Sequence, residues 1–344
     1  MGDVSLTVPA ITGVIEANPD LEITLVTRKF FAPFFFGIPR LRLLFPDLHG
    51  RHKGIIGLLR LYADLKKEGS YEAVIDLHGV IRTRIISFLF KNSGTSVFSI
   101  DKGRNEKKQL IRSKCIKMLK HTTERYLDVF LMAGFKGRIG KAPFLNFNKY
   151  ASLKATLFID KNNIGAGKLK IGLAPFATAP PKIWGIQKFR DLVSLIDAGH
   201  QAEYFLFGGG AEEIVLLEEF QQFSSKIHLV AGKLELSEEL ALISMLDLMI
   251  SMDSSNMHLA ALSGIPTISI WGGTHPAFGF SAIGQPTGYH IQTPVNALKC
   301  RPCSVFGNKP CIYTSTRCMD MVTPEDVYRS LCNFKLLNSD GESA

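Results

Sequence analysis

The chain has 344 residues, of which 46% are hydrophobic and 21% are charged, and it contains six cysteines. This composition excludes intrinsic disorder and a small disulfide framework, and no apolar run reaches the roughly 20 residues of a membrane-spanning helix. The net charge of +9 is uneven, because residues 1–150 carry 25 Lys and Arg against 13 Asp and Glu, and residues 151–344 carry 15 against 18. The basic half is expected to meet an anionic partner (nucleic acid, a lipid surface or a phosphorylated substrate); a solvated lysine-rich surface is the alternative.

Helical and extended patterns alternate in the first half. Asp3 stands where a signal peptide carries basic residues, and no apolar segment follows it, so we expect an intracellular protein. Strands are predicted at 21–27, 71–77 and 97–100, and helices at 6–18, 54–67 and 107–134. This alternation predicts a parallel sheet covered by helices, in a domain of residues 1–150.

A polar segment at 150–167 predicts a domain boundary, and residues 151–344 then repeat the pattern more regularly. Strands are predicted at 170–175, 203–207, 226–230, 248–252 and 267–271, with helices at 187–198, 212–223, 237–246 and 256–263. A last helix at 324–333 is expected to pack back on the first domain. The fold class is therefore α/β, with two Rossmann-like doubly wound domains that face each other across a cleft and bind ligands at the carboxyl ends of their strands.

A turn rich in Asp and Ser follows the predicted strand 248–252. Asp253, Ser254 or Ser255 can cap the next helix, and the free N–H groups at such a helix start bind phosphate; an ordinary capped turn is the alternative. Residues 254–298 include no Asp, Glu, Lys or Arg, which indicates a central position in the fold. His258 is then either a packed core histidine or a ligand contact.

Two further loops follow predicted strands. After 170–175, a loop of small residues and prolines carries Thr178 and a single lysine, Lys182, which suits a diphosphate unless it is merely solvated. After 203–207, three glycines precede Glu212, which could accept ribose hydroxyls. The glycine fingerprint of dehydrogenases is absent, which disfavours an NAD-dependent enzyme.

These motifs together resemble glycosyltransferase family 9, the bacterial heptosyltransferases that move heptose from ADP-heptose during assembly of the lipopolysaccharide core. The resemblance rests on Lys182-x-Trp184 and Asp253-Ser254-x-x-x-His258, and it extends to the segments 75–82, 121–125 and 271–276. It implies a GT-B fold and an inverting transferase with a nucleotide-diphosphate sugar donor and a glycolipid acceptor. No cofactor, metal ion or nucleic-acid partner is implied.

The resemblance also implies roles for individual residues. Asp3, in a Gly-Asp pair, would be the catalytic base, and Lys182 would neutralise the leaving diphosphate. Donor contacts are implied for Thr178, Lys182, Glu212, Asp253, Ser254, Ser255 and His258. Ser255 stands where the family usually has glycine. The family also has a strand before its Gly-Asp pair that this chain lacks, so we expect an incomplete first sheet and Asp3 on a loosely held terminus.

Two rival functions fit the same motifs. One is a GT-B transferase with another nucleotide-sugar donor, since no motif identifies the sugar. The other is a non-catalytic nucleotide-sugar binder, inactive because the first strand is absent.

Two features outside these motifs have alternative interpretations. Cys300, Cys303, Cys311 and Cys318 could bind structural zinc, remain free thiols or form disulfides. The aromatic segment 30–36, followed by Arg40, Arg42 and Arg51, could contact the inner face of the inner membrane in an otherwise cytoplasmic protein; core packing of these phenylalanines is the alternative.

Overall fold

The computed structural model describes residues 1–165 and 167–337, which form two compact units. The N-terminal unit comprises residues 3–104 and 120–141, and the C-terminal unit comprises residues 1–2, 105–119 and the chain from Ala142 onward. The boundary expected at residue 150 falls inside helix α7 (Lys149–Lys161) of the C-terminal unit. Residues 105–119, which come from the basic half of the sequence, also belong to the C-terminal unit.

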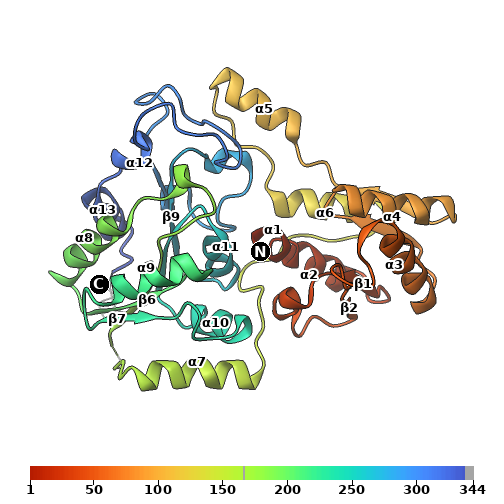
Figure 1. Cartoon of the computed structure of the whole chain (residues 1–344), viewed down its shortest axis with the longest axis horizontal. Helices are drawn as coiled ribbons and strands as arrows, with labels where there is room; N and C mark the ends of the chain where they lie inside the picture. Colours follow the sequence, from red (N-terminus) through yellow and green to blue (C-terminus); the bar gives the residue numbers. More distant parts are fainter. Residues whose placement is uncertain (166, 338–344) are drawn as a thin grey trace. The chain divides into compact units, whose positions relative to one another are not determined.

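The C-terminal unit is built on six strands and the helices that connect them (Figure 1). Its strands are β5 (Leu169–Ala174), β6 (Ala202–Leu206), β7 (Ile227–Leu229), β8 (Leu248–Met252), β9 (Thr267–Trp271) and β10 (His290–Gln292). Its helices are α5 (Arg104–Ser113), α7, η2 (Pro180–Lys182), α8 (Ile186–Asp197), α9 (Ala211–Gln221), α10 (Leu236–Ile243), α11 (Ser255–Leu262), η3 (Pro276–Phe278), η4 (Thr287–Tyr289), α12 (Arg317–Asp320) and α13 (Pro324–Asn333).

The six strands are all parallel, in the order β10-β9-β8-β5-β6-β7. This is the doubly wound order, in which the chain moves outward from β5 in one direction and from β8 in the other. Every residue of β6, β8 and β9 is buried, because apolar runs without alternation fill strands covered on both faces. The predicted second-half strands and helices are thereby confirmed to within a few residues.

One large core joins the sheet to α8, α9 and α13. The last helix was predicted at the right residues, and it packs against α8 within its own unit. Trp184 contributes to this core, and its Nε1 donates a hydrogen bond of 2.8 Å to the carbonyl oxygen of Val322. The chain after the cysteine-rich segment is thereby fixed to the sheet.

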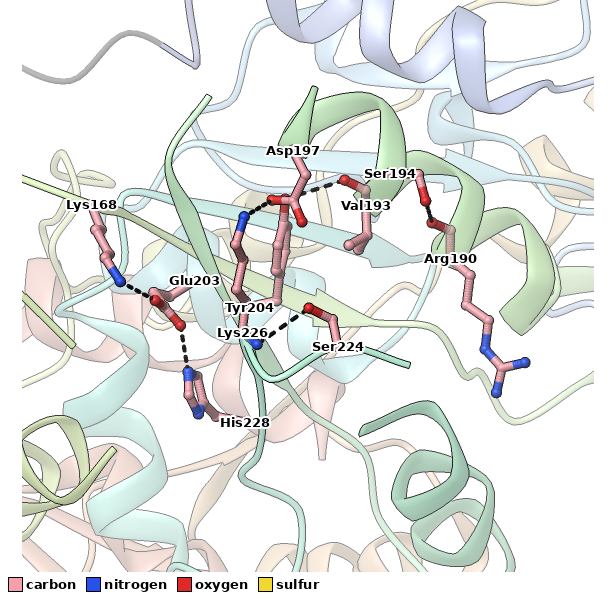
Figure 2. Close-up of polar contacts among 10 residues, drawn as sticks. All are labelled: Lys168, Arg190, Val193, Ser194, Asp197, Glu203, Tyr204, Ser224, Lys226 and His228. Carbon is pink, nitrogen blue, oxygen red and sulfur yellow. Dashed lines mark hydrogen bonds and ion pairs between the residues drawn. The ribbon is translucent and has the colours of Figure 1, made fainter. Parts of the chain in front are cut away.

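Charged side chains connect the amino ends of β5, β6 and β7 (Figure 2). Glu203, which is 5% exposed, lies 2.7 Å from His228 and 2.6 Å from Lys168. The hydroxyl of Tyr204 donates to Asp197 of α8 at 3.0 Å. This network satisfies buried polar groups at the edge of the sheet opposite the carboxyl ends of the strands.

The N-terminal unit contains shorter elements (Figure 1). They are α1 (Gly2–Ser5), α2 (Val8–Ala17), β1 (Ile23–Val26), η1 (Lys29–Phe35), β2 (Leu41–Leu44), α3 (Gly54–Glu68), β3 (Ala73–Asp76), α4 (Ile81–Asn92), β4 (Ser96–Ser99) and α6 (Thr122–Met132). Within the described residues, β1 pairs in parallel with β2 and β3 pairs in parallel with β4, which makes two separate two-stranded sheets. The alternation of elements predicted one parallel sheet, and the resemblance predicted that this sheet would be incomplete; the described strands form two pairs instead. Most residues of these four strands are only half-buried.

Two expectations for the first half were wrong in detail. The predicted helix 107–134 is interrupted between α5 and α6, where Lys114 adopts a left-handed backbone conformation (φ 54°) and donates to the carbonyl oxygens of Cys300 and Pro302. Asp3 lies in the helical turn α1 rather than on a loose terminus, and its carbonyl oxygen accepts a hydrogen bond of 3.2 Å from the Tyr126 hydroxyl.

The aromatic segment 30–36 divides between core and surface. Phe34 and Phe35 are buried, as the packing interpretation requires, whereas Phe30 and Phe36 are 52% and 45% exposed. Among the described residues, no helix combines the length and apolar character needed to cross a membrane.

Candidate functional site

The loops after β5 and β8 leave the C-terminal sheet where its connections change direction. β5 and β8 are neighbours, with Leu173 opposite Ile250, but β5 leads on to β6 while β8 leads on to β9. Loops that diverge at such a switch point leave a crevice outside the carboxyl ends of the strands. Lys182 and Asp253 lie in these two loops.

Lys182 and Asp253 form an almost completely buried ion pair. The Nζ atom of Lys182 lies 3.0 Å from Oδ2 of Asp253, with side-chain exposures of 13% and 4%. The hydroxyl of Thr274, in the turn after β9, donates to the same carboxylate at 2.7 Å. Burial raises the pKa of Asp253 above its ordinary value, and the charge of Lys182 and the hydrogen bond from Thr274 act against that rise.

Arg301 holds the turn that carries Thr274. Its side chain is fully buried and donates to the carbonyl oxygens of Gly272 at 2.7 Å and of Thr274 at 3.1 Å. It also donates to the side-chain oxygen of Gln292 at 3.0 Å and to the carbonyl oxygen of Thr293. The sequence analysis did not single out Arg301. The feature that could have indicated it is its position between Cys300 and Cys303, close to the end of the long uncharged segment 254–298.

The amino end of α11 follows Asp253 directly. Ser254 precedes the first helical residue, Ser255, and the Ser254 side chain makes no capping hydrogen bond; its Oγ lies 3.1 Å from Oγ of Ser251. The first amide groups of the helix therefore keep the positive end of the helix dipole without a capping side chain. His258 is buried one turn further along α11, and Gly2 approaches its ring so closely that a Cβ atom at Gly2 would lie 3.0 Å from Cδ2.

In the glycine turn after β6, the glutamate that contacts the turn is Glu213, one residue after the Glu212 chosen from the sequence. The N–H group of Gly209 donates to Oε2 of Glu213 at 2.9 Å, while Glu212 is exposed. Thr178, in the loop after β5, is also exposed. Glu213 therefore orders the turn, and Glu212 and Thr178 keep side chains that are accessible to a ligand.

In the N-terminal unit, Asp3 lies among ionisable side chains near the end of β3. Burial raises the pKa of Tyr126, and the negative charge of Asp3 raises it further. Burial lowers the pKa of His78, as does the nearby Lys102, whereas Asp3 and Asp76 act in the opposite direction. Asp76 caps the turn that starts α4, because its Oδ1 accepts from the N–H groups of His78 and Gly79. Asp3 is exposed, so its carboxylate can reach a ligand.

The cysteine-rich segment contains free thiols. All six cysteines are unpaired by disulfides, and within the described residues no three His, Cys, Asp or Glu side chains converge on a possible metal position. Burial raises the pKa of Cys303 to about 11, and the neighbouring thiols, with Cys300 first among them, add to that rise. The Cys303 thiol is thus neutral at pH 7.

An all-parallel sheet in doubly wound order, with a lysine and a helix start at its switch point, is typical of nucleotide-binding α/β proteins. The model of glycosyltransferase family 9 (heptosyltransferase) matches residues 58–309, and the chain belongs to this family and is a glycosyltransferase. The α/β architecture is that of GT-B heptosyltransferases. The family resemblance and the α/β fold class with a parallel sheet, both inferred from the sequence, are confirmed.

Relatives and solved structures extend the similarity over most of the chain. The lipopolysaccharide core heptosyltransferase OpsX of Haemophilus influenzae is 24% identical over 80% of this chain and 77% of its own length. Lipooligosaccharide heptosyltransferase 2 of Campylobacter jejuni is 23% identical over 96% and 95%. A family 9 glycosyltransferase of Veillonella parvula superposes with a TM-score of 0.74 at 20% identity, covering 98% of this chain and 94% of that one. For ADP-heptose lipopolysaccharide heptosyltransferase II of E. coli the TM-score is 0.66 at 17% identity, with 98% and 96% covered.

Proposed function

We propose that the chain transfers a heptosyl group from ADP-heptose to a hydroxyl group of a lipopolysaccharide-core glycolipid, with inversion at the anomeric carbon. The observation that carries this proposal is the largely buried Lys182, held beside the amino end of α11 at the switch point of the sheet. The names of two relatives, a lipopolysaccharide core heptosyltransferase and a lipooligosaccharide heptosyltransferase, support the choice of donor and acceptor class.

The diphosphate of the donor would occupy the amino end of α11. There the amides of Ser254 and Ser255 can donate to phosphate oxygens, and Lys182 can exchange part of its contact with Asp253 for the phosphates. Asp253, still oriented by Thr274, would then lie near the donor sugar. Thr178, Glu212 and His258 would complete the donor site, with Glu212 accepting from the ribose hydroxyls.

The reaction would be a single displacement. The acceptor oxygen forms a bond to the anomeric carbon while the bond from that carbon to the diphosphate oxygen breaks, and the electron pair leaves with ADP. Asp3 takes the proton of the attacking hydroxyl, and Lys182 and the helix amides stabilise the charge that develops on the diphosphate. Asp3 suits this role because its carboxylate is exposed and its backbone is held by Tyr126.

The acceptor would meet the N-terminal unit. Lys102, Arg82 and His78 lie within electrostatic range of one another, near Asp3, and could pair with anionic groups of a core glycolipid. A glycolipid acceptor would also bring the chain to the cytoplasmic face of the inner membrane.

The proposal is tested by ADP release from ADP-heptose in the presence of a delipidated core oligosaccharide. Asp3→Asn should lower kcat by roughly 100-fold to 10,000-fold, the usual contribution of a general base, while binding of ADP stays unchanged. Asp20→Asn, another exposed carboxylate of the same unit, is the matched control and should keep full activity. Full activity of Asp3→Asn would contradict the assigned base. If the wild-type chain bound ADP-heptose but released no ADP with any acceptor, the binder interpretation would hold, and turnover with another nucleotide sugar alone would correct the donor.

A further inference from the structure

A basic and apolar surface lies on the C-terminal unit, outside the donor site. We call this surface, which residues 105–119 and 299–317 form, the basic surface. These segments carry nine Lys and Arg, of which all but the buried Lys107 and Arg301 are at least partly exposed, and a single acidic residue, Glu106. The contrast is sharp, because residues 151–344 as a whole have more Asp and Glu than Lys and Arg.

Direct contacts join the two segments. The Nζ atom of Lys114 donates to the carbonyl oxygens of Cys300 at 3.1 Å and of Pro302 at 2.9 Å. Leu110 and Ile111 of α5 share a small core with Val305. The segment from the first half of the sequence is therefore a fixed part of this surface.

The inner face of α5 packs against the unit, while its outer face is basic. Leu110 and Lys107 are buried, and the Lys107 ammonium lies 5.6 Å from the centre of the Phe280 ring. Lys108 and Arg112 are one turn apart and exposed, as is Lys117 beyond the helix. These three cations have no ion-pair partner among the side chains of the described part of the chain.

Large apolar side chains are exposed in the same two segments. Ile116 and Met118 are 38% and 53% exposed, on either side of Lys117. Phe306 is 67% exposed and stacks on Phe280, with ring centres 6.4 Å apart. In the same loop Ile312 is 77% exposed. Cations interspersed with exposed apolar residues complement an anionic bilayer, whose headgroups attract the charges and whose acyl boundary accepts the apolar side chains.

We propose that the basic surface docks the chain on an anionic phospholipid bilayer. The inference rests on the proposed function in one respect only, since a glycolipid acceptor supplies the reason for membrane contact. It moves that contact away from the aromatic segment 30–36, whose central phenylalanines are buried. The loop 299–317 also touches the donor site, because a Cβ atom at Gly307 would lie 2.7 Å from Cδ of Lys182. Docking would thus hold the donor site close to the membrane.

The test is co-sedimentation of the full chain with phosphatidylcholine vesicles that contain increasing fractions of phosphatidylglycerol. Binding should rise with the anionic fraction and weaken with salt. Each cation near an anionic leaflet strengthens binding roughly fivefold, so Lys108→Gln/Arg112→Gln/Lys117→Gln should weaken it roughly 100-fold. Ile116→Ser/Met118→Ser should remove the part of the binding that persists at high salt.

The matched control is helix α7, which also combines lysines with exposed apolar residues. Tyr150, Leu153 and Leu157 are 61%, 55% and 49% exposed there. Lys149→Gln/Lys154→Gln/Lys161→Gln removes the same charge and should leave vesicle binding unchanged. Equal binding of the wild-type chain to neutral and anionic vesicles would overturn the proposal. So would loss of binding in the α7 variant together with unchanged binding in Lys108→Gln/Arg112→Gln/Lys117→Gln.

A failure here is separable from a failure of the proposed function. Vesicle binding requires neither donor nor turnover. We expect the Lys108→Gln/Arg112→Gln/Lys117→Gln variant to lose vesicle binding and still to release ADP at the wild-type rate with the delipidated acceptor.

Discussion

The sheets of the two units differ in how completely their strands are buried. In the C-terminal unit β6, β8 and β9 are buried at every position, and the described residues form one continuous sheet of six strands. In the N-terminal unit four short strands form two separate pairs, and most of their residues are half-buried. The proposed donor site therefore stands on a rigid frame, whereas the unit assigned to the acceptor has the lower local stability expected from its smaller core.

The largest expected effect tests this difference in packing. Ile250→Ala, in the centre of β8, should lower the free energy of unfolding by about 3 kcal/mol, because it leaves a cavity in a fully buried strand. Ile75→Ala, in half-buried β3, should cost about 1 kcal/mol. Urea unfolding followed by circular dichroism measures both losses, because both units contain helices and strands that contribute to the signal. Equal losses in the two variants would remove the contrast between the units.

Sequence patterns predicted the C-terminal unit well because its strands are continuous apolar runs and its helices have one apolar face. They missed α7, whose buried positions are the small residues Ala151 and Ala155 while Leu153 and Leu157 face solvent. The interruption after α5 could not be predicted, since it depends on the carbonyl oxygens of Cys300 and Pro302, far away in the sequence.

The candidate site shows the same limit. Lys182 and Asp253 could be selected from local motifs, because each follows a recognisable buried strand. Their pairing, and the contact of Thr274 with the same carboxylate, depend on strand order and on the buried Arg301. The sequence analysis chose Glu212 and not Glu213, because a sequence pattern alone cannot decide which of two adjacent residues at a helix start contacts the glycine turn. The structure shows that Glu213 makes this contact.

A second, smaller effect concerns the pH dependence of the donor site. Thr274→Val removes a hydrogen bond that lowers the pKa of Asp253, so the pKa should rise further above its ordinary value. An enzyme that needs the ionised carboxylate loses activity as the pH is lowered through this pKa. The acidic limb of the kcat/KM profile of Thr274→Val should therefore lie about one pH unit above that of the wild type. Thr267→Val removes a buried hydroxyl that donates to the carbonyl oxygen of Ile265 and should leave the limb in place. An unchanged limb in Thr274→Val would exclude a role for this contact.

The smallest expected effect separates Glu212 from Glu213. Glu212→Ala should weaken ADP binding roughly fivefold and abolish the preference for ADP over 2′-deoxy-ADP, because the carboxylate would accept from a ribose hydroxyl. Glu213→Ala should keep that preference, since its side chain accepts from Gly209 within the turn. Calorimetric titration with both nucleotides measures the difference, and the reverse result would assign the ribose to Glu213.

Isothermal titration with ADP tests most directly the claim that the donor site belongs to the C-terminal unit. Lys182→Met should weaken ADP binding at least roughly tenfold, since a charge-assisted contact to phosphate is lost. Lys170→Met, which removes the partner of Asp247 at the opposite end of β5, and Asp3→Asn in the N-terminal unit should both bind ADP as the wild type does. Wild-type affinity in Lys182→Met, or loss of ADP binding in Asp3→Asn, would contradict the account.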